Sequence, residues 1–206
     1  MDKIILYHGG DKPMPTAHIQ RPGPRADCDF GQGFYLTPDK HIAEEWVRKK
    51  QPPIISVYEL TYSPQEVLHL AGDDWLRVII GCRENAYPVR FSKNIVIGSI
   101  ANDRLFPMLG LFMDTTLIVG IGDRRLLECI TLVNLGDQYV LKDSTHGLVL
   151  LESYALTGER LHAANDRHAT RRRGMNDALA AIRRKNYDNE RFADDFIKEC
   201  RDGITL

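Results

Sequence analysis

The 206-residue sequence has few cysteines and no pattern that pairs them. Its four cysteines, Cys28, Cys82, Cys129 and Cys200, are widely spaced, with no CxxC pair and no local cluster with histidine. This spacing argues against a disulfide framework and against a zinc site, so we expect no bound metal and a reducing, cytoplasmic location. A P-loop and a Rossmann glycine motif are also missing, which excludes these two ways of holding phosphates.

Long apolar runs and a strong net charge are absent as well. The most apolar stretch, 105–121, is interrupted by Pro107, Asp114 and two threonines, so we expect no membrane span. The N-terminus lacks the pattern of a signal peptide, because the chain enters a predicted strand almost at once. A formal net charge of -1 gives no general attraction to nucleic acid or acidic membranes. The remaining composition, 43% hydrophobic and 27% charged, is that of a globular protein.

A glycine turn near residue 32 is the most distinctive local pattern that is present. Gly31 and Gly33 allow a sharp turn and a close approach of the backbone to a bound group. The aromatic-rich residues that follow predict a short strand carrying Tyr35. Taken alone, this pair of glycines is also compatible with an ordinary tight turn in which Tyr35 is half-buried.

A helix is expected directly after that strand. Thr37 is predicted to cap it, with Pro38 at the first helical position and Asp39 in the first turn. The apolar positions that follow recur at helical spacing and predict one buried face, made of Ile42, Ala43, Trp46 and Val47.

A second glycine motif ends the first predicted strand, 4–7, in His8-Gly9. The order of the two motifs, His-Gly first and then Asp-Phe-Gly-x-Gly-Phe-Tyr-Leu-Thr with its helix, resembles the ADP-ribosyltransferases of the poly-ADP-ribosyl and diphtheria-toxin-like branch. It is similar, more closely, to a bacterial family of transferase-like proteins with the same two motifs. The later arrangement Gly-x-x-Ala-Asn-Asp, which ends at Asn102 and Asp103, extends the resemblance to roughly residues 4–150.

The rest of the chain predicts an alternation of strands and helices. Strands are expected at 54–62, 67–70, 94–103 and 139–142, and helices at 73–82 and 123–133, whereas the apolar residues of 145–154 allow either. The fold implied by the resemblance is α+β, with split and mostly antiparallel sheets around an NAD cleft. Function has to be argued from the site and not from that fold.

The resemblance implies roles for individual residues of this chain. A histidine at His8 would hydrogen-bond the adenosine ribose of NAD, and the backbone of Gly9 would bind the carboxamide of nicotinamide. Tyr35 would stack on the nicotinamide ring, with Gly33 and Asn102 as further NAD-binding positions. These residue types suit such roles, because imidazole can donate and accept at a hydroxyl and phenol offers a flat face.

The chain departs from the resembled enzymes at the third catalytic position. Those enzymes place a glutamate at the start of a late strand, where this sequence has Gln138. Glutamine can hydrogen-bond a ribose but cannot act as a base or stabilise positive charge as a carboxylate does. Either the acceptor needs little activation, or NAD binds without efficient turnover. Glu128, Asp137 and Glu152 are alternative carboxylates, each of which also fits an ordinary surface or capping role.

The C-terminal part differs in composition and predicts an appendage. Residues 160–187 carry eight basic and two acidic side chains, and residues 188–202 carry six acidic and three basic ones. We expect a transferase-like domain at 1–155 and a charged helical extension at 156–206. The extension is either a mutually neutralising helical pair or a surface for nucleic acid or an acidic partner.

In the loop after the first strand, Arg21 and Arg25 are either phosphate contacts or solvated side chains.

The resemblance carried by these motifs implies an NAD-dependent ADP-ribosyltransferase, toxin-like and held in check by an inhibitory partner protein. NAD would be its substrate, and the acceptor a protein or a nucleic acid. Two alternatives stay open: a non-catalytic module that binds NAD or another nucleotide, and an NAD glycohydrolase that uses water as the acceptor.

Overall fold

The computed structural model describes residues 1–19, 28–83, 89–101 and 135–187 of the chain. The chain divides into two compact units, and each is considered by itself. The first unit, Met1–Ile100 with Leu135–Thr170, holds every described strand. The second unit, Ala101–Asn134 with Arg171–Leu206, is described at Ala101 and over the helical residues 171–187. The predicted helix at 123–133, the acidic segment at 188–202, and Asn102 and Asp103 lie outside the described residues.

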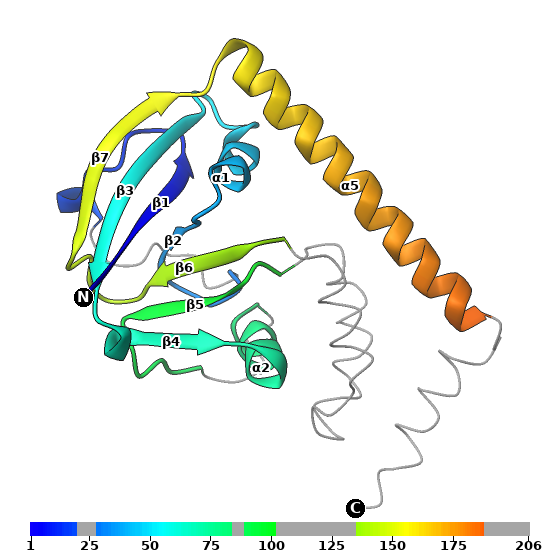
Figure 1. Ribbon diagram of the computed structural model, residues 1–206, viewed down its shortest axis with the longest axis horizontal. Coiled ribbons are helices and arrows are strands. Elements are labelled where there is room, and N and C mark those ends of the chain that lie inside the picture. Colours follow the sequence, from blue (N-terminus) through cyan, green and yellow to red (C-terminus); the bar gives the residue numbers. More distant parts are fainter. Residues whose placement is uncertain (20–27, 84–88, 102–134, 188–206) are drawn as a thin grey trace, which may run out of the picture. The chain divides into compact units, whose positions relative to one another are not determined.

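The first sheet contains three antiparallel strands in the order β1-β3-β7 (Figure 1). They are β1 (Asp2–Gly10), β3 (Ile54–Tyr62) and β7 (Leu148–Ala155). The strands predicted at the N-terminus and at 54–62 are confirmed, and the ambiguous segment 145–154 contributes a strand, not a helix. A glycine with positive φ, Gly147 at +77°, turns the chain into β7.

The second sheet contains four strands in the order β2-β6-β5-β4. They are β2 (Phe34–Leu36), β4 (Val67–Leu70), β5 (Ile95–Ser99) and β6 (Asp137–Leu141). Only β4 and β5 run parallel, so the protein is α+β with one antiparallel and one mixed sheet. Each of these strands was predicted to within a few residues, because each is a short apolar run bounded by glycine or polar residues.

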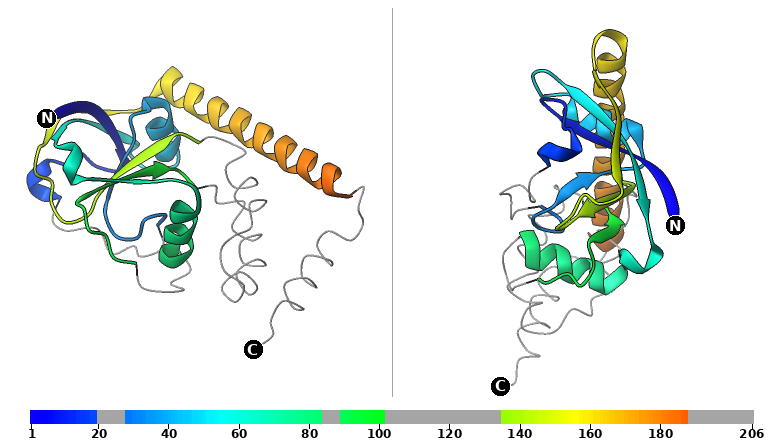
Figure 2. Two further views of the ribbon diagram at one scale, coloured as in Figure 1. Left: turned by 60° about the horizontal axis from the view of Figure 1, so that its bottom comes forward. Right: turned by 90° about the vertical axis from the view of Figure 1, so that its left-hand side faces the viewer.

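The helices of the first unit lie outside the sheets (Figure 2). They are α1 (Lys40–Val47), α2 (Gly72–Arg83) and the first turns of α5 (Gly158–Tyr187), with two short 3-10 helices, η1 (Thr16–His18) and η2 (Pro64–Glu66). No helix in the described part of the chain is long and apolar enough to cross a membrane.

The predicted start of α1 was wrong by two residues. Asp39, not Thr37, is the N-cap, and its side chain accepts a hydrogen bond from the backbone N–H of His41 at 2.8 Å. Thr37 is occupied elsewhere, because its hydroxyl donates to the carbonyl of Asp137 at 3.0 Å and accepts from the backbone N–H of Asp39 at 3.2 Å. Both residue types are good caps, and the tertiary contact with Asp137 decides between them.

The main core lies between the two sheets. It is formed by buried apolar side chains from both, among them Leu6, Phe34, Leu36, Tyr58, Leu60, Ile95, Ile97, Leu141 and Leu148. A second cluster covers the other face of the first sheet, where Ile55 and Val57 pack against α1 and the start of α5. In the described part of the chain, an isolated bridge between Tyr7 and Thr37 also joins β1 to the end of β2, with N–O distances of 2.8 and 3.0 Å.

Candidate functional site

The bridge between the sheets brings the two glycine motifs together. Directly beyond it, Nδ1 of His8 lies 2.8 Å from the carbonyl oxygen of Tyr35. His8 therefore reaches from the end of β1 to the backbone of β2, although 27 residues separate them in sequence. The imidazole also packs on the ring of Phe34, with centroids 4.5 Å apart. The structure thus places His8, Gly9 and the strand of Tyr35 at one end of the first sheet.

The protonation state of His8 follows from its partner. A carbonyl oxygen only accepts, so Nδ1 of His8 carries the hydrogen and Nε2 is left as an acceptor in the neutral ring. Burial lowers the pKa of His8 below its ordinary value of 6.5, against the opposing effect of the Tyr35 hydrogen bond, and nearby Lys50 lowers it further. His8 is therefore neutral at pH 7 and offers one acceptor atom at the end of β1.

Gly9 lies against α1 so closely that a side chain would not fit. A Cβ atom at this position would come 2.4 Å from Cγ1 of Val47 and 2.9 Å from the carbonyl oxygen of Ala43. The same point lies 3.5 Å from Cβ of Trp46, whose side chain is half-buried. Trp46 was predicted to belong to the buried face of the helix. Its position places a large aromatic side chain beside the backbone of Gly9.

Tyr35 is held by the loop before it. Its hydroxyl donates to the carbonyl of Gly31 at 2.6 Å and accepts from the backbone N–H of Phe30 at 3.0 Å. Because successive side chains of a strand point to opposite faces, the phenol of Tyr35 points away from the face on which Phe34 meets His8. Burial raises the pKa of Tyr35, so the hydroxyl keeps its proton and can donate.

Removing this hydroxyl tests how much it contributes. We expect Tyr35→Phe to lower the free energy of unfolding by about 1–3 kcal/mol, because the buried backbone groups of Phe30 and Gly31 lose a partner. Denaturant titration measures the difference, and Tyr139→Phe, which removes a hydroxyl bonded to Tyr62 outside the loop, is the comparison for the loss of a tyrosine hydroxyl elsewhere. An unchanged midpoint in Tyr35→Phe, relative to wild type, would show that the loop does not depend on the phenol.

Gln138 lies in a buried polar cluster and not on an open surface. Its side chain is 3% exposed, and its amide nitrogen donates to Oδ2 of Asp29 at 2.7 Å and to the carbonyl of Ser99 at 3.3 Å. Asp29, itself 5% exposed, also forms an ion pair with Arg83 of α2. Both N–H groups of Gln138 are therefore used, and only its carbonyl oxygen could meet a ribose hydroxyl.

Lys142 holds the same loop from the end of β6. Its side chain is 8% exposed, and its ammonium donates to the carbonyl of Phe30 at 2.6 Å and to the carbonyl of Gln32. Burial lowers the pKa of Lys142, partly offset by the nearby Cys82, Asp143 and Cys28. The sequence analysis did not identify Lys142 as a site residue. The one feature that could have indicated its burial is its position directly after the apolar residues of a predicted strand.

The remaining predicted residues are spread over the unit. Gly33 allows close packing on β6, since a Cβ there would lie 2.2 Å from Cγ1 of Val140. Asp137 and Glu152 are exposed, whereas Glu128 and Asn102 lie outside the described residues, as do Arg21 and Arg25. The described residues contain no group of three or more potential metal ligands among His, Cys, Asp and Glu.

A comparison with protein families matches residues 4–151 to a family described as "Protein of unknown function (DUF3990)". The chain belongs to this DUF3990 family. No curated protein and no solved structure matches the sequence. The family match begins inside β1, includes β2 to β6 and the first half of β7, and contains the residues around His8, Tyr35 and Gln138. It ends before α5, whose first turns nevertheless pack on α1 in the same unit.

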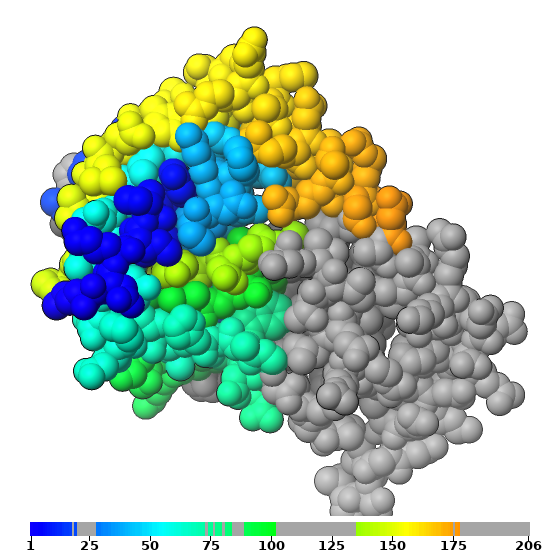
Figure 3. All heavy atoms as spheres, viewed as in Figure 1, coloured from blue at the N-terminus to red at the C-terminus, as the bar shows by residue number. Residues whose placement is uncertain are grey.

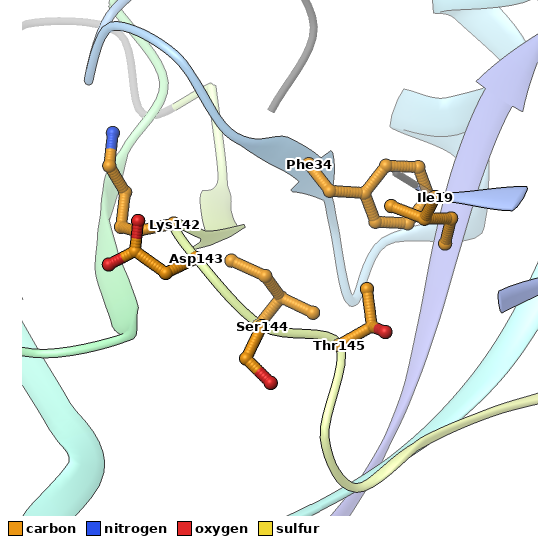
Figure 4. A pocket seen from close by; sticks show the side chains of 7 residues that line it. Ile19, Phe34, Lys142, Asp143, Ser144 and Thr145 are labelled. Atoms are coloured by element: carbon orange, nitrogen blue, oxygen red, sulfur yellow. The ribbon is translucent and has the colours of Figure 1, made fainter. Parts of the chain in front are cut away.

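One hollow borders the DUF3990 region beside Phe34 (Figure 4). Its volume is about 20 Å³, and its walls combine apolar side chains with the polar loop after β6, namely Ile19, Phe34, Leu141, Lys142, Asp143, Ser144 and Thr145. Asn94 fixes that loop, because its Oδ1 accepts from the backbone N–H groups of Asp143 and Ser144, both at 2.9 Å. The hollow is separated from His8 by the ring of Phe34, on which the imidazole packs.

Proposed function

We propose that this protein is an NAD-dependent ADP-ribosyltransferase with split sheets of the transferase-like kind, working in the cytoplasm on a macromolecular acceptor. One observation carries the proposal: the imidazole of His8 is bonded to the backbone of the Gly-Phe-Tyr strand across the bridge between the sheets. Two motifs that are far apart in sequence, one on each sheet, thereby meet at the bridge that joins β1 to β2. An inhibitory partner protein is part of the same proposal, on the resemblance to toxin-like enzymes.

Transfer of ADP-ribose from NAD does not require a strong general acid. Breaking the bond between nicotinamide and its ribose passes through a transition state with the character of an oxocarbenium ion, and nicotinamide leaves as a neutral molecule. Holding NAD in a bent shape and placing the acceptor beside the ribose therefore supply most of the rate. A site built mainly from an imidazole, an open backbone edge and aromatic rings suits that task.

In the proposed complex each residue has a distinct role. Nε2 of neutral His8 accepts a hydrogen bond from the adenosine ribose, and the backbone of Gly9 binds the carboxamide of nicotinamide. Tyr35, whose phenol lies on the face of β2 opposite His8 and is held by the loop 28–31, stacks on the nicotinamide, so NAD would have to pass around the β2 edge of the sheet to reach both groups. Half-buried Trp46 provides a second aromatic side chain beside Gly9. Gln138 meets the ribose through its carbonyl oxygen.

Removing the His8 imidazole tests the proposal directly. We expect His8→Ala to weaken NAD binding by roughly 5- to 100-fold in isothermal titration calorimetry, the loss of one buried hydrogen bond. His69→Ala, an exposed histidine on β4, is the matched control and should bind as wild type does. Equal affinity in wild type and His8→Ala would reject the assignment.

The same residue predicts a pH dependence. Because burial lowers the pKa of His8 below 6.5, the folded protein resists protonation that the unfolded chain accepts. Stability should be full above pH 6.5 and decline as the pH falls below that value, whereas NAD affinity should decline only at the lower pH at which the folded protein protonates His8, since protonated Nε2 no longer accepts. The decline in affinity should be absent from His8→Gln.

The second candidate is a module that binds NAD without turning it over. The burial of Gln138, with both N–H groups on Asp29 and Ser99, favours it, because no carboxylate stands at that position. Incubation with labelled NAD, with and without cell extract, separates the possibilities. Catalytic release of nicotinamide with label on a macromolecule supports the transferase, release without label supports the glycohydrolase, and stoichiometric binding alone supports the module. Protease and nuclease treatment then shows which class of acceptor keeps the label.

A further inference from the structure

Helix α1 is buried on two sides, although the apolar pattern of its sequence predicts a single buried face. One side presents Ala43 and Val47 to Gly9, as described above. On another side Glu44 and Glu45 are 3% and 4% exposed, where helical periodicity alone would leave glutamates in water. Charged side chains are almost never fully buried unless they are paired, so these two carboxylates need partners.

The partners come from the first turns of α5. Oε1 of Glu44 lies 3.2 Å from Arg160, and Oε2 forms an ion pair with Arg167. Oε2 of Glu45 lies 3.6 Å from Nδ1 of His168. We refer to these five residues as the α1–α5 clamp.

Arg48, at the C-terminal end of α1, adds to the clamp. It donates to the backbone carbonyl of Glu45 at 2.6 Å and to Nε2 of His168 at 2.8 Å. Since arginine only donates, Nε2 of His168 accepts and its hydrogen lies on Nδ1, which faces Glu45. His168 thus connects Arg48, which donates to its Nε2, with Glu45, which faces its Nδ1.

Apolar contacts surround the clamp and fix its position. Leu156 and Ala164, both fully buried, pack with Val47, Ile55 and Val57 in one cluster. Figure 3 shows the light-blue atoms of α1 between the dark-blue β1 and the yellow first turns of α5. Ala43 and Val47, which pack with Leu156 and Ala164, are also the α1 residues nearest to Gly9, since a Cβ there would lie 2.9 Å from the carbonyl oxygen of Ala43 and 2.4 Å from Cγ1 of Val47. A displacement of the start of α5 would therefore reach Gly9 through these two residues.

We propose that the α1–α5 clamp positions Trp46 and the Gly9 edge of the candidate site, so that Arg160, Arg167 and His168 are positioning residues for ligand binding. These three residues lie beyond the end of the family match at residue 151. The part of the proposal that concerns NAD rests on the proposed function, whereas the effect on Trp46 does not.

Fluorine NMR tests the clamp without any ligand. The chain has two tryptophans, Trp46 and Trp75, so protein labelled with 5-fluorotryptophan should give two resonances, assigned with Trp46→Phe. We expect Arg167→Met and Glu44→Gln to shift the Trp46 resonance and leave that of Trp75, whose indole donates to the carbonyl of Ser99 at 2.8 Å. Arg167→Lys, which keeps the charge, should restore most of the wild-type position. Glu159→Gln, an exposed change on α5, is the matched control.

Ligand binding provides the second readout. If the protein binds NAD, Arg167→Met should weaken binding by roughly 3- to 30-fold, and Arg167→Lys should recover most of the affinity. A Trp46 resonance that stays at its wild-type position in both folded Arg167→Met and Glu44→Gln would overturn the clamp. A wild-type protein that binds no NAD would refute the proposed function but leave the NMR result to decide the clamp. Should Arg167→Met fail to fold, the isosteric Glu44→Gln decides alone.

Discussion

Gly9→Ala is expected to lower the free energy of unfolding by about 3 kcal/mol, one of the two largest effects that we predict. The added methyl group would lie 2.4 Å from Cγ1 of Val47 and 2.9 Å from the carbonyl oxygen of Ala43. The second of these is a backbone atom, so relief requires α1 or the end of β1 to move. Thermal and denaturant unfolding of the purified variant measure the loss.

The neighbouring glycine provides the control. At Gly10 a Cβ would lie 3.5 Å from Nε2 of His8 and 3.5 Å from the carbonyl oxygen of Lys12, both ordinary contact distances. Gly10→Ala should therefore change stability by less than about 1 kcal/mol. Equal losses in the two variants would show that close packing on α1 is not the reason for glycine at position 9. A stable Gly9→Ala protein would contradict the prediction outright.

Lys142→Met is expected to cost about 2–4 kcal/mol, because a buried cation that satisfies two carbonyls is replaced by a side chain that cannot donate. The oxygens of Phe30 and Gln32 would lose their donor, and the ring of Phe91 would lose an ammonium 4.2 Å from its centroid. Chemical unfolding monitored by tryptophan fluorescence reports the change.

The control for this variant is an exposed lysine. Lys49→Met removes the same charge at the end of α1 and should stay within about 0.5 kcal/mol of wild type. Without Lys142, the loop that contains Phe30 and Gln32 should be held less firmly. Cys82, which is half-buried beside Gly31, should then react faster with a thiol reagent. A Lys142→Met protein as stable as Lys49→Met would show that the loop is held by Tyr35 and Asp29 alone.

Local patterns in the sequence were sufficient for most strands of the first unit. The strands at 54–62 and 67–70 were predicted with the observed bounds, because each is rich in apolar and β-branched residues and lies between proline or polar turns. The start of α1 was missed by two residues, because Thr37 and Asp39 are both good caps and a contact 100 residues away in sequence occupies Thr37.

The side-chain partners of the candidate site were beyond the reach of sequence patterns. The burial of Glu44 depends on Arg160 and Arg167, which are 116 and 123 residues further along the chain. The loop before β2 is likewise held by Lys142, 112 residues from Phe30. Periodicity assigns one face of a helix to the core, but it contains no information about a second helix that covers another face.

The bridge between Tyr7 and Thr37 has a consequence for the geometry around His8. Its two backbone hydrogen bonds, 2.8 and 3.0 Å long, fix the spacing of β1 and β2 at this point, beside the core that the two sheets share. His8 and the carbonyl of Tyr35 are immediate neighbours of that bridge. The spacing of these two groups is therefore set by main-chain hydrogen bonds, and replacing the side chains of Tyr7 or Thr37 by other residues that keep the backbone N–H should leave it in place.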